Sequence, residues 1–356
     1  MEGLDARGRS LGSLGIALPG FSFYRFDPAG AAGTRAPLIG VSMQPTWGTL
    51  TQADVTQNVQ ATRFPHLAIA YPFNESATVL FTYSGVLDQR WRMEDERQLP
   101  LAGESVTVVD EFVTDGGLSV VDLGWAQRIG ERFAVGGMIG FHTGGLRRQL
   151  TRTFDATELG TTVDPFSLVG SWKIGGPALT VSARWEPSEI VRVGLGVEWA
   201  GTLDITPTEG TNLGAQTAKI PTKFRLGASG RLSPALSLVG GVSYADWEGT
   251  PSGLAAAVRT SAEIIYGLGL EFTGLGLLDR EMPLRLGYRH TDYPYQFEQA
   301  DAAESLLAFG LGYVFASLDG YALASLDMAA ETGKRTAGGL EESFWRATFS
   351  LRLSGN

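Results

Sequence analysis

Polar and apolar residues alternate with a period of two along most of this chain. Residues 219–247 show the pattern most clearly, because between 222 and 232 the apolar side chains fall on one face and lysine, arginine and serine on the other. The alternation resumes at residue 236, after the short turn Ser233-Pro234-Ala235. A period of two predicts β-strands, and the turn is too short for a crossover helix, so this stretch predicts an antiparallel hairpin.

The same alternation predicts fourteen strands, at residues 38–47, 64–73, 78–85, 118–127, 133–143, 179–185, 191–199, 222–232, 236–247, 264–272, 284–289, 307–315, 321–331 and 344–353. A fifteenth candidate at 166–174 runs directly into the next strand, and we leave it out because single-chain bacterial barrels have an even number of strands. Residues 147–154 alternate again, so we expect the strand before them to project beyond a membrane. The remaining long segments predict loops, at 87–114, 200–219, 248–262 and 291–304.

Two further patterns favour a membrane barrel over a soluble sandwich or propeller. Short turns alternate with long polar loops, and aromatic residues gather near the strand ends, where they suit the two membrane interfaces: Trp185, Trp199, Trp247, Tyr288, Phe315 and Trp345. No run approaches the roughly 18 apolar residues that a spanning helix needs, and a closed barrel satisfies its backbone groups in lipid without helices. We therefore predict an all-β fold, a 14-stranded antiparallel transmembrane β-barrel.

Composition removes several classes of function. The net charge of −10 argues against a nucleic-acid partner, and the absence of cysteine rules out disulfides and thiolate chemistry. His66, His142 and His290 are too far apart in sequence to form a metal-binding spacing, so we expect no metal and no cofactor. No serine has a nucleophile-elbow motif, and we expect the protein not to be an enzyme.

Glycine is unusually abundant, with 47 residues in 356, where about 7% is typical. Glycine weakens a strand unless the backbone bends or another group approaches closely. Seven glycines fall on the side opposite the apolar face, where they would let something approach the lumen wall: Gly194, Gly196, Gly267, Gly269, Gly287, Gly310 and Gly312.

The first 37 residues are glycine-rich, do not alternate, and are too apolar for a solvated tail. We expect them to be buried inside the rest of the molecule. Met1-Glu2-Gly3 is not followed by a basic region and an apolar core. For an exported protein we therefore expect Met1 to be an addition to a mature chain, with the signal peptide not among these residues.

Several stretches, in this order, resemble the FadL family of outer-membrane transporters for long-chain fatty acids and other hydrophobic molecules. They are ARGRSLGSLGIAL followed by FDPAG, then FPHLAIAYPFNESATVLFTYSG, KIPTKFRLGASGRLSPALSLVGGVSYADW, LRLGYRHTDYP and LLAFGLGYVF. Asp27, Pro28 and Ala29 are similar to the family's Asn-Pro-Ala hatch motif, with aspartate in place of asparagine. An Asp-Pro pair can form the same side-chain-capped turn, which we expect here.

The resemblance implies a monomeric barrel at residues 38–356 with an N-terminal hatch, or plug, at 1–37 inside its lumen. It implies an outer membrane of the Gram-negative type, contact with membrane lipid, and a hydrophobic small molecule such as a fatty acid as ligand. In the family the ligand leaves sideways through a gap made by a kink in the third strand. Ser84 and Gly85 are the candidate kink here.

Two sets of residues are candidates for ligand contact. The aromatic residues Phe21, Phe23, Tyr24 and Phe26 could line an apolar pocket, or they could pack the plug against the wall. Lumen arginines, of which Arg225, Arg285 and Arg289 are the main candidates, could hold a carboxylate. Alternatively they could pair with Glu198, Glu271 and plug carboxylates such as Asp27.

The sequence therefore predicts passive uptake of hydrophobic molecules through a plugged barrel. The alternative is a FadL-like barrel that does not transport, and that acts as a scaffold or shuttle for another outer-membrane or secreted protein. An ordered polar loop surface without a lateral gap at Ser84-Gly85 would favour the alternative.

Overall fold

The computed structural model describes residues 4–12, 14–52, 55–101, 104–155, 163–210, 214–248, 261–297, 299–318 and 321–355. Two short helices, α1 (Ala6–Ser10) and the 3-10 helix η1 (Pro28–Ala31), lie in the N-terminal segment, defined here as residues 4–37. Neither is long or apolar enough to cross a membrane. The strands are β1 (Leu38–Gln52), β2 (Val55–Pro72), β3 (Ala77–Asp88), β4 (Trp91–Leu101), β5 (Glu104–Ile129), β6 (Phe133–Phe154), β7 (Phe166–Ser188), β8 (Val191–Ala200), β9 (Thr202–Glu209), β10 (Gln216–Lys219), β11 (Lys223–Ser233), β12 (Leu236–Asp246), β13 (Ala262–Phe272), β14 (Gly276–Leu277), β15 (Arg280–Glu281), β16 (Leu284–Phe297), β17 (Ala300–Leu318), β18 (Tyr321–Ala337) and β19 (Leu340–Ser354).

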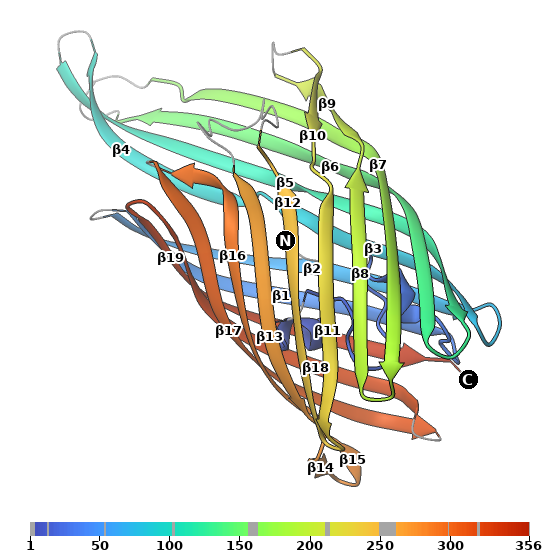
Figure 1. Cartoon of the computed structure of the whole chain (residues 1–356). Coiled ribbons are helices and arrows are strands. Elements are labelled where there is room, and N and C mark those ends of the chain that lie inside the picture. The colour runs from blue at the N-terminus through green and yellow to red at the C-terminus, as the bar shows by residue number, and fades with distance from the viewer. Residues whose placement is uncertain are drawn as a thin grey trace.

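Fourteen of these strands close into one antiparallel barrel (Figure 1). Each pairs with its neighbour in the order β1, β2, β3, β5, β6, β7, β8, β11, β12, β13, β16, β17, β18 and β19. β19 then pairs with β1, from Leu38↔Ser354 to Gln52↔Leu340, and completes the ring. The prediction of a 14-stranded antiparallel barrel is confirmed.

The prediction of long loops was partly wrong. The segment 87–114 holds β4 and the first half of β5, which pair with each other from Trp91↔Thr114 to Leu101↔Glu104. The segment 200–219 holds β9 and β10, and 291–304 belongs mostly to β16 and β17. Most of 248–262 lies outside the described residues. We call the end of the barrel that carries β4, β9 and β10 the projecting end.

The candidate strand at 166–174 is not separate but forms the first section of β7. Pro177 lies within this long strand, although proline cannot donate a backbone hydrogen bond to a ladder. In the structure β7 changes partner here: residues up to Gly175 pair with β9, and residues from Ala178 pair with β8. Pro177 therefore lies at a position that misses no ladder hydrogen bond to these two strands.

Polarity across the wall is inverted relative to a water-soluble sheet. Large apolar side chains point outward and are exposed, for example Leu226 at 50% and Leu268 at 55%, whereas the inward Arg225 and Glu331 are buried. The outward apolar surface ends toward the projecting end in aromatic residues, where Trp47 is opposite Trp345. This is the pattern of a wall that faces lipid outside and polar groups inside.

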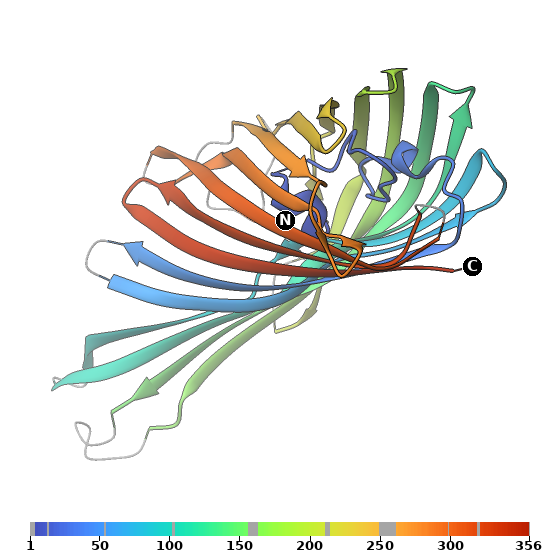
Figure 2. The same cartoon turned by 90° about the horizontal axis from the view of Figure 1, so that it is seen from below.

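β5, β6 and β7 are much longer than a membrane requires. They contain 26, 22 and 23 residues, whereas about 9–11 tilted residues span a bilayer. The first halves of β5 and β7 and the last half of β6 therefore project beyond the apolar band. Together with β4 they form a wide curved sheet (Figures 1 and 2). The expected projection of the strand that begins at residue 133 is confirmed.

Candidate functional site

The N-terminal segment lies inside the barrel and reaches opposite walls. α1 contacts β16, β17, β18 and β19, whereas η1 contacts β3, β5, β6 and β7. Gly12 has φ of +56°, and a Cβ on the facing Gly267 would lie 1.9 Å from the Gly12 carbonyl oxygen. Six of the seven glycines singled out in the sequence face this segment in the same way: Gly194, Gly196, Gly267, Gly269, Gly287 and Gly310. Lack of a side chain is what allows this close approach, which is to backbone atoms at four of the six and to side chains at Gly194 and Gly310.

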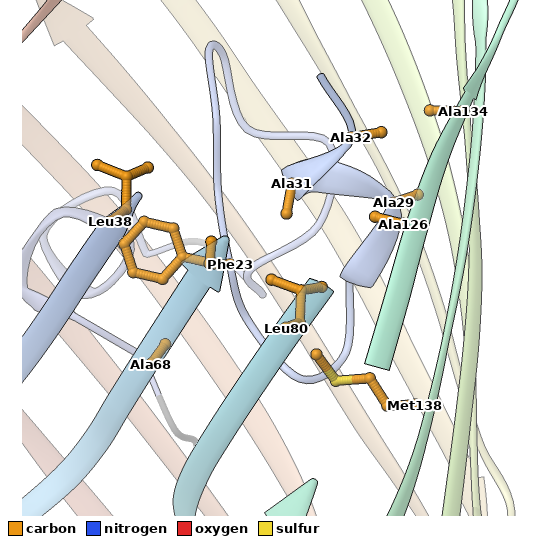
Figure 3. Packing of buried hydrophobic residues seen from close by; sticks show 11 residues of the cluster. Phe23, Ala29, Ala31, Ala32, Leu38, Ala68, Leu80, Ala126, Ala134 and Met138 are labelled. Atoms are coloured by element: carbon orange, nitrogen blue, oxygen red, sulfur yellow. The ribbon is translucent and has the colours of Figure 1, made fainter. Parts of the chain in front are cut away.

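The aromatic residues of the segment pack against the wall. Phe23 stacks on His66 with ring centroids 6.1 Å apart, and lies in an apolar cluster with wall residues such as Leu80 and Met138 (Figure 3). The Tyr24 hydroxyl donates to Asp5 over 2.5 Å. The centroid of the Phe26 ring lies 4.1 Å from the guanidinium carbon of Arg225. Phe21, the fourth candidate, is partly exposed. These contacts match the packing alternative, and a ligand role for the four residues stays a prediction.

Asp27 does not cap the turn that it begins, which corrects the expectation of a capped turn. Its side chain makes no cap hydrogen bond to η1. Instead it is fully buried and accepts hydrogen bonds from Arg184 Nη2 over 2.7 Å and from the Ala17 amide over 3.1 Å. The next residues, Pro28 and Ala29, are buried, and the Ala29 amide donates to Ser182 Oγ. Asp27 thus joins the segment to β7 through an ion pair.

The three candidate arginines of the lumen all face carboxylates of the protein itself. Arg225 pairs with Glu198 over 2.8 Å. Arg285 pairs with Glu271 over 2.8 Å and with Asp327 over 2.6 Å. All three arginines are buried, so each serves first to neutralise a buried carboxylate.

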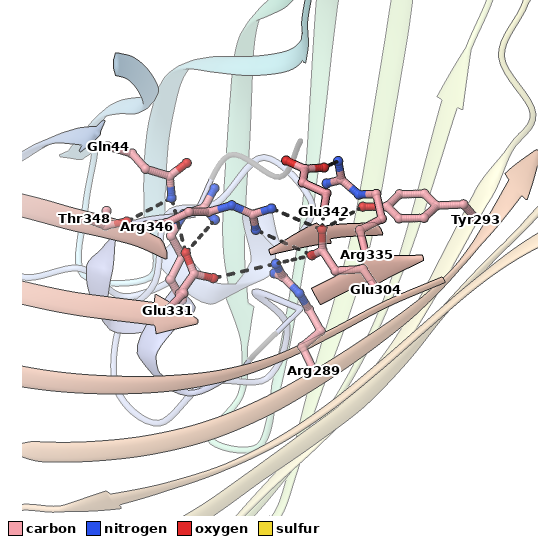
Figure 4. Close-up of polar contacts among 10 residues, drawn as sticks. Gln44, Arg289, Tyr293, Glu304, Glu331, Arg335, Glu342, Arg346 and Thr348 are labelled. Carbon is pink, nitrogen blue, oxygen red and sulfur yellow. Dashed lines mark hydrogen bonds and ion pairs between the residues drawn. The ribbon is translucent and has the colours of Figure 1, made fainter. Parts of the chain in front are cut away.

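Arg289, the third, belongs to a larger cluster on β16–β19 (Figure 4). It lies 4.0 Å from Glu304 and 3.7 Å from Glu331. Glu304 also pairs with Arg335 over 2.7 Å and with Arg346 over 3.1 Å. This inner wall is therefore cross-linked by charge around the N-terminal segment.

A seam interrupts the wall between β2 and β3. Their pairing ends at His66↔Ser84, although β2 stays paired with β1, and β3 with β5, for further residues toward the projecting end. The β3–β5 register shifts between Gly85 and Leu87. The candidate kink at Ser84 and Gly85 coincides with this point. Two exposed apolar residues lie beside the seam, Phe64 on β2 at 63% and Leu87 on β3 at 45%.

A second feature is an apolar groove of about 650 Å³ at the projecting end, which we call the inner groove. Its lining includes five large apolar side chains from four strands, namely Trp91, Phe112, Leu150, Leu168 and Trp172. Arg148 and Thr114 also line it. The ladder runs from Phe112↔Leu150 without a register shift to Val120↔His142, whose side chains are buried on the lumen side. Because side chains alternate strictly, the groove lies on the inner face.

The groove was not predicted from the sequence, because 87–114 was expected to be a loop. The signal was present in Val106 and Val108, which alternate with polar residues and are fully buried. It was masked by the charged run from Arg92 to Arg97. Trp91 and Trp172 are far apart in sequence. Only the successive pairing of β4 with β5, β5 with β6 and β6 with β7 places them on one surface.

Among the described residues, no group of three or more histidine, cysteine, aspartate or glutamate side chains is arranged to hold a metal ion. His66 lies beside Phe23 and Tyr24, and His142 lies on β6. His290 contacts Ser305 and Asp292.

Comparison with known proteins gave a match in structure but not in sequence. No family model matches the chain, and no curated protein matches it. The Pseudomonas putida toluene transporter TodX superposes with a TM-score of 0.64 at 11% identity, over 100% of this chain and 99% of that one. The CymD monoaromatic hydrocarbon channel gives 0.61 at 12% identity, over 99% and 98%. A Pseudomonas aeruginosa FadL homologue gives 0.57 at 11% identity, over 95% and 98%.

At such low identity these matches establish the architecture. They cover nearly the whole length of both chains. The predicted resemblance to the FadL family is confirmed at the level of the fold: the chain has the 14-stranded barrel fold of FadL-type outer-membrane channels.

Proposed function

We propose that this protein is an outer-membrane channel for the passive uptake of small hydrophobic molecules. The observation that carries the proposal is the inner groove. Its large apolar side chains lie at the projecting end and are exposed to solvent when no ligand is bound. Leu168 is 54% exposed and Trp91 is 41% exposed. Exposed apolar concavities of this size are typical of ligand sites. Transfer of a hydrophobic molecule from water into this groove is favourable in free energy.

The chemistry of the groove sets the class of ligand. Its walls are aromatic and aliphatic, which suits hydrocarbons as well as acyl chains. Arg148 lines the groove and makes no ion pair with a carboxylate among the described residues, so it supplies a partner for an anionic head group. The inner-wall candidates Arg225, Arg285 and Arg289 already face protein carboxylates. We therefore place a fatty-acid carboxylate at Arg148 rather than at those three.

The seam supplies the way out. Beyond His66 and Ser84 no backbone ladder joins β2 to β3, and the exposed Phe64 and Leu87 offer an apolar passage to surrounding lipid. In this proposal residues 1–37 act as the hatch that blocks a straight aqueous path through the barrel of residues 38–356. Phe21, Phe23, Tyr24 and Phe26 form its packed apolar surface.

Three of the solved structures support this proposal in outline, since those proteins are a toluene transporter, a monoaromatic hydrocarbon channel and a FadL homologue. The channel acts as a monomer in contact with lipid, performs no catalysis and binds no nucleic acid. The scaffold alternative called for a wall without a lateral gap at Ser84-Gly85. The unpaired seam at that point favours the channel.

Contact quenching of tryptophan tests the groove directly. Bromobenzene and 12-bromododecanoic acid quench an indole that they touch, so each should quench the fluorescence of the protein in lipid nanodiscs. Trp91→Phe should remove a fraction of this quenching, and Trp91→Ala should also weaken binding by about 5–30-fold, the equivalent of about 1–2 kcal/mol. The outward Trp345→Phe is the matched control for quenching through the lipid. If Trp91→Phe and Trp345→Phe lose the same fraction of the quenching, the ligand does not bind in the groove.

Replacing Arg148 separates the two ligand classes. Arg148→Gln should weaken binding of the bromo acid and leave bromobenzene unchanged, because only the acid carries a charge. Arg147→Gln, on the neighbouring residue of the same strand, serves as control. If the two probes respond alike to Arg148→Gln, the carboxylate assignment is wrong.

A further inference from the structure

Side chains bridge the seam between β2 and β3 at the level where the backbone ladder is missing. Asp88, the last residue of β3, lies 2.9 Å from Arg63 Nε on β2. The same carboxylate accepts two hydrogen bonds from Arg90, over 2.9 Å from Nε and 2.7 Å from Nη2. Arg90 Nη2 also donates to the Thr62 carbonyl of β2 over 3.1 Å. We call these four residues, Thr62, Arg63, Asp88 and Arg90, the latch.

A second bridge continues the line toward the projecting end. Gln57 of β2 donates through Nε2 to the Arg92 carbonyl of β4 over 2.6 Å. The edge of β2 from residue 57 to residue 63 is thus joined to β3 and β4 by side chains. Elsewhere around the described barrel, neighbouring strands are joined by backbone ladders.

From this arrangement we infer that the latch is a gate: Asp88 holds the seam closed, and the seam opens when its bonds to Arg63 and Arg90 break. The inference rests on the proposed function, in which the seam is the exit. Asp88 is the centre of the latch because one buried carboxylate, 6% exposed, serves both arginines. Without it, Arg63 and Arg90 would remain as two like charges on opposite sides of an unpaired gap.

The strength of the latch suits a gate that opens reversibly. The Arg63 and Arg90 side chains are 26% and 48% exposed, and exposed ion pairs contribute little to stability because water and salt screen them. A backbone ladder at the same place would add a row of paired amides and carbonyls that all have to break together. The seam is therefore the weakest join of the described wall and the place where a ligand can separate β2 from β3.

Apolar residues lie directly beside the latch. Phe64 is next to Arg63 in sequence, and Leu87 is next to Asp88. Both are exposed, so breaking the latch frees a gap with apolar edges. A hydrophobic molecule would cross this gap more readily than water or an ion.

Distance measurement between two spin labels tests the latch without any ligand. The chain has no native cysteine, so labels on Gln60→Cys and Gln89→Cys report only the separation of β2 from the end of β3. The full-length protein in lipid nanodiscs should give a narrow distribution. Asp88→Asn, which keeps the shape and removes the charge, should broaden it toward longer distances. An unchanged distribution in Asp88→Asn would overturn the inference.

Two further variants serve as controls. Glu341→Gln removes a 2.7 Å ion pair to Lys334 across β18 and β19, which are joined by a full backbone ladder, so it should leave the distribution unchanged. If Asp88→Asn does not fold, Arg63→Gln removes the β2 side of the pair and should broaden the distribution as well; no change there would equally overturn the inference.

The same variants separate the latch from the exit route. With Asp88→Asn, transfer of bound 12-bromododecanoic acid into the surrounding lipid should become several-fold faster. A broadened distance distribution with an unchanged transfer rate would support the latch and contradict the proposed lateral exit. A faster transfer with no change in distance would contradict the latch.

Discussion

Buried charges on the inner wall are arranged so that few depend on water. Arg184 and Asp27 illustrate the rule, because both are almost fully buried and they form an ion pair of 2.7 Å. Removing one member of such a pair strands the other charge in a poorly solvated place, which costs more than the pair itself contributes. At the residue scale, the N-terminal segment is therefore held in the barrel by specific ion pairs as well as by apolar packing.

Replacing Arg184 tests this interpretation. Arg184→Gln should destabilise the folded barrel by about 3–5 kcal/mol, since the Asp27 carboxylate keeps only the Ala17 amide as a partner. Adding Asp27→Asn to the same chain should recover most of that loss, because no charge is left unpaired. Thermal unfolding in detergent measures both. Equal loss in the single and the double variant would mean that the pair is not what matters.

At the scale of elements, the sequence predicted the spanning strands well, because a strand between lipid and a polar lumen must alternate. It failed where that constraint ends. The charged run in β4 is exposed on both of its faces, and Pro177 marks a change of partner in β7, so neither followed the simple pattern. The inner groove was out of reach for another reason. It depends on the register of four strands, which places Trp91, Phe112 and Leu168 on one surface.

The N-terminal segment, by contrast, could be inferred as buried from its apolar residues, and the glycines that receive it could be inferred from the alternation. Gly287→Ala tests their role, because the added Cβ would lie 2.3 Å from the Gly12 amide nitrogen. We expect the segment to shift, with faster protease cleavage within it and ion conductance in planar bilayers. Gly137→Ala, where the nearest atom is 3.8 Å away, should change neither. If Gly287→Ala shows the same ion conductance and the same rate of protease cleavage as Gly137→Ala, the interpretation of the segment as a plug is contradicted.

At the scale of the whole molecule, the apolar outer surface fixes the position of the barrel in a bilayer. Leu226 lies in the middle of β11 and is 50% exposed, whereas Thr49 lies on β1 beyond the aromatic position Trp47. Leu226→Arg should therefore lower the free energy of unfolding from lipid vesicles by about 2–4 kcal/mol, and Thr49→Arg by about 0–1 kcal/mol. Similar costs at the two positions would place the membrane elsewhere on the wall.

If the barrel binds and passes hydrophobic small molecules, it should retain one when it is purified. Native mass spectrometry of the detergent-released protein, with solvent extraction of whatever it carries, measures this. We predict a stoichiometric apolar molecule, a hydrocarbon or a fatty acid, on a monomeric chain, with its occupancy reduced by Trp91→Ala. A chain free of small molecules that instead retains a defined protein partner would contradict the channel and favour the scaffold.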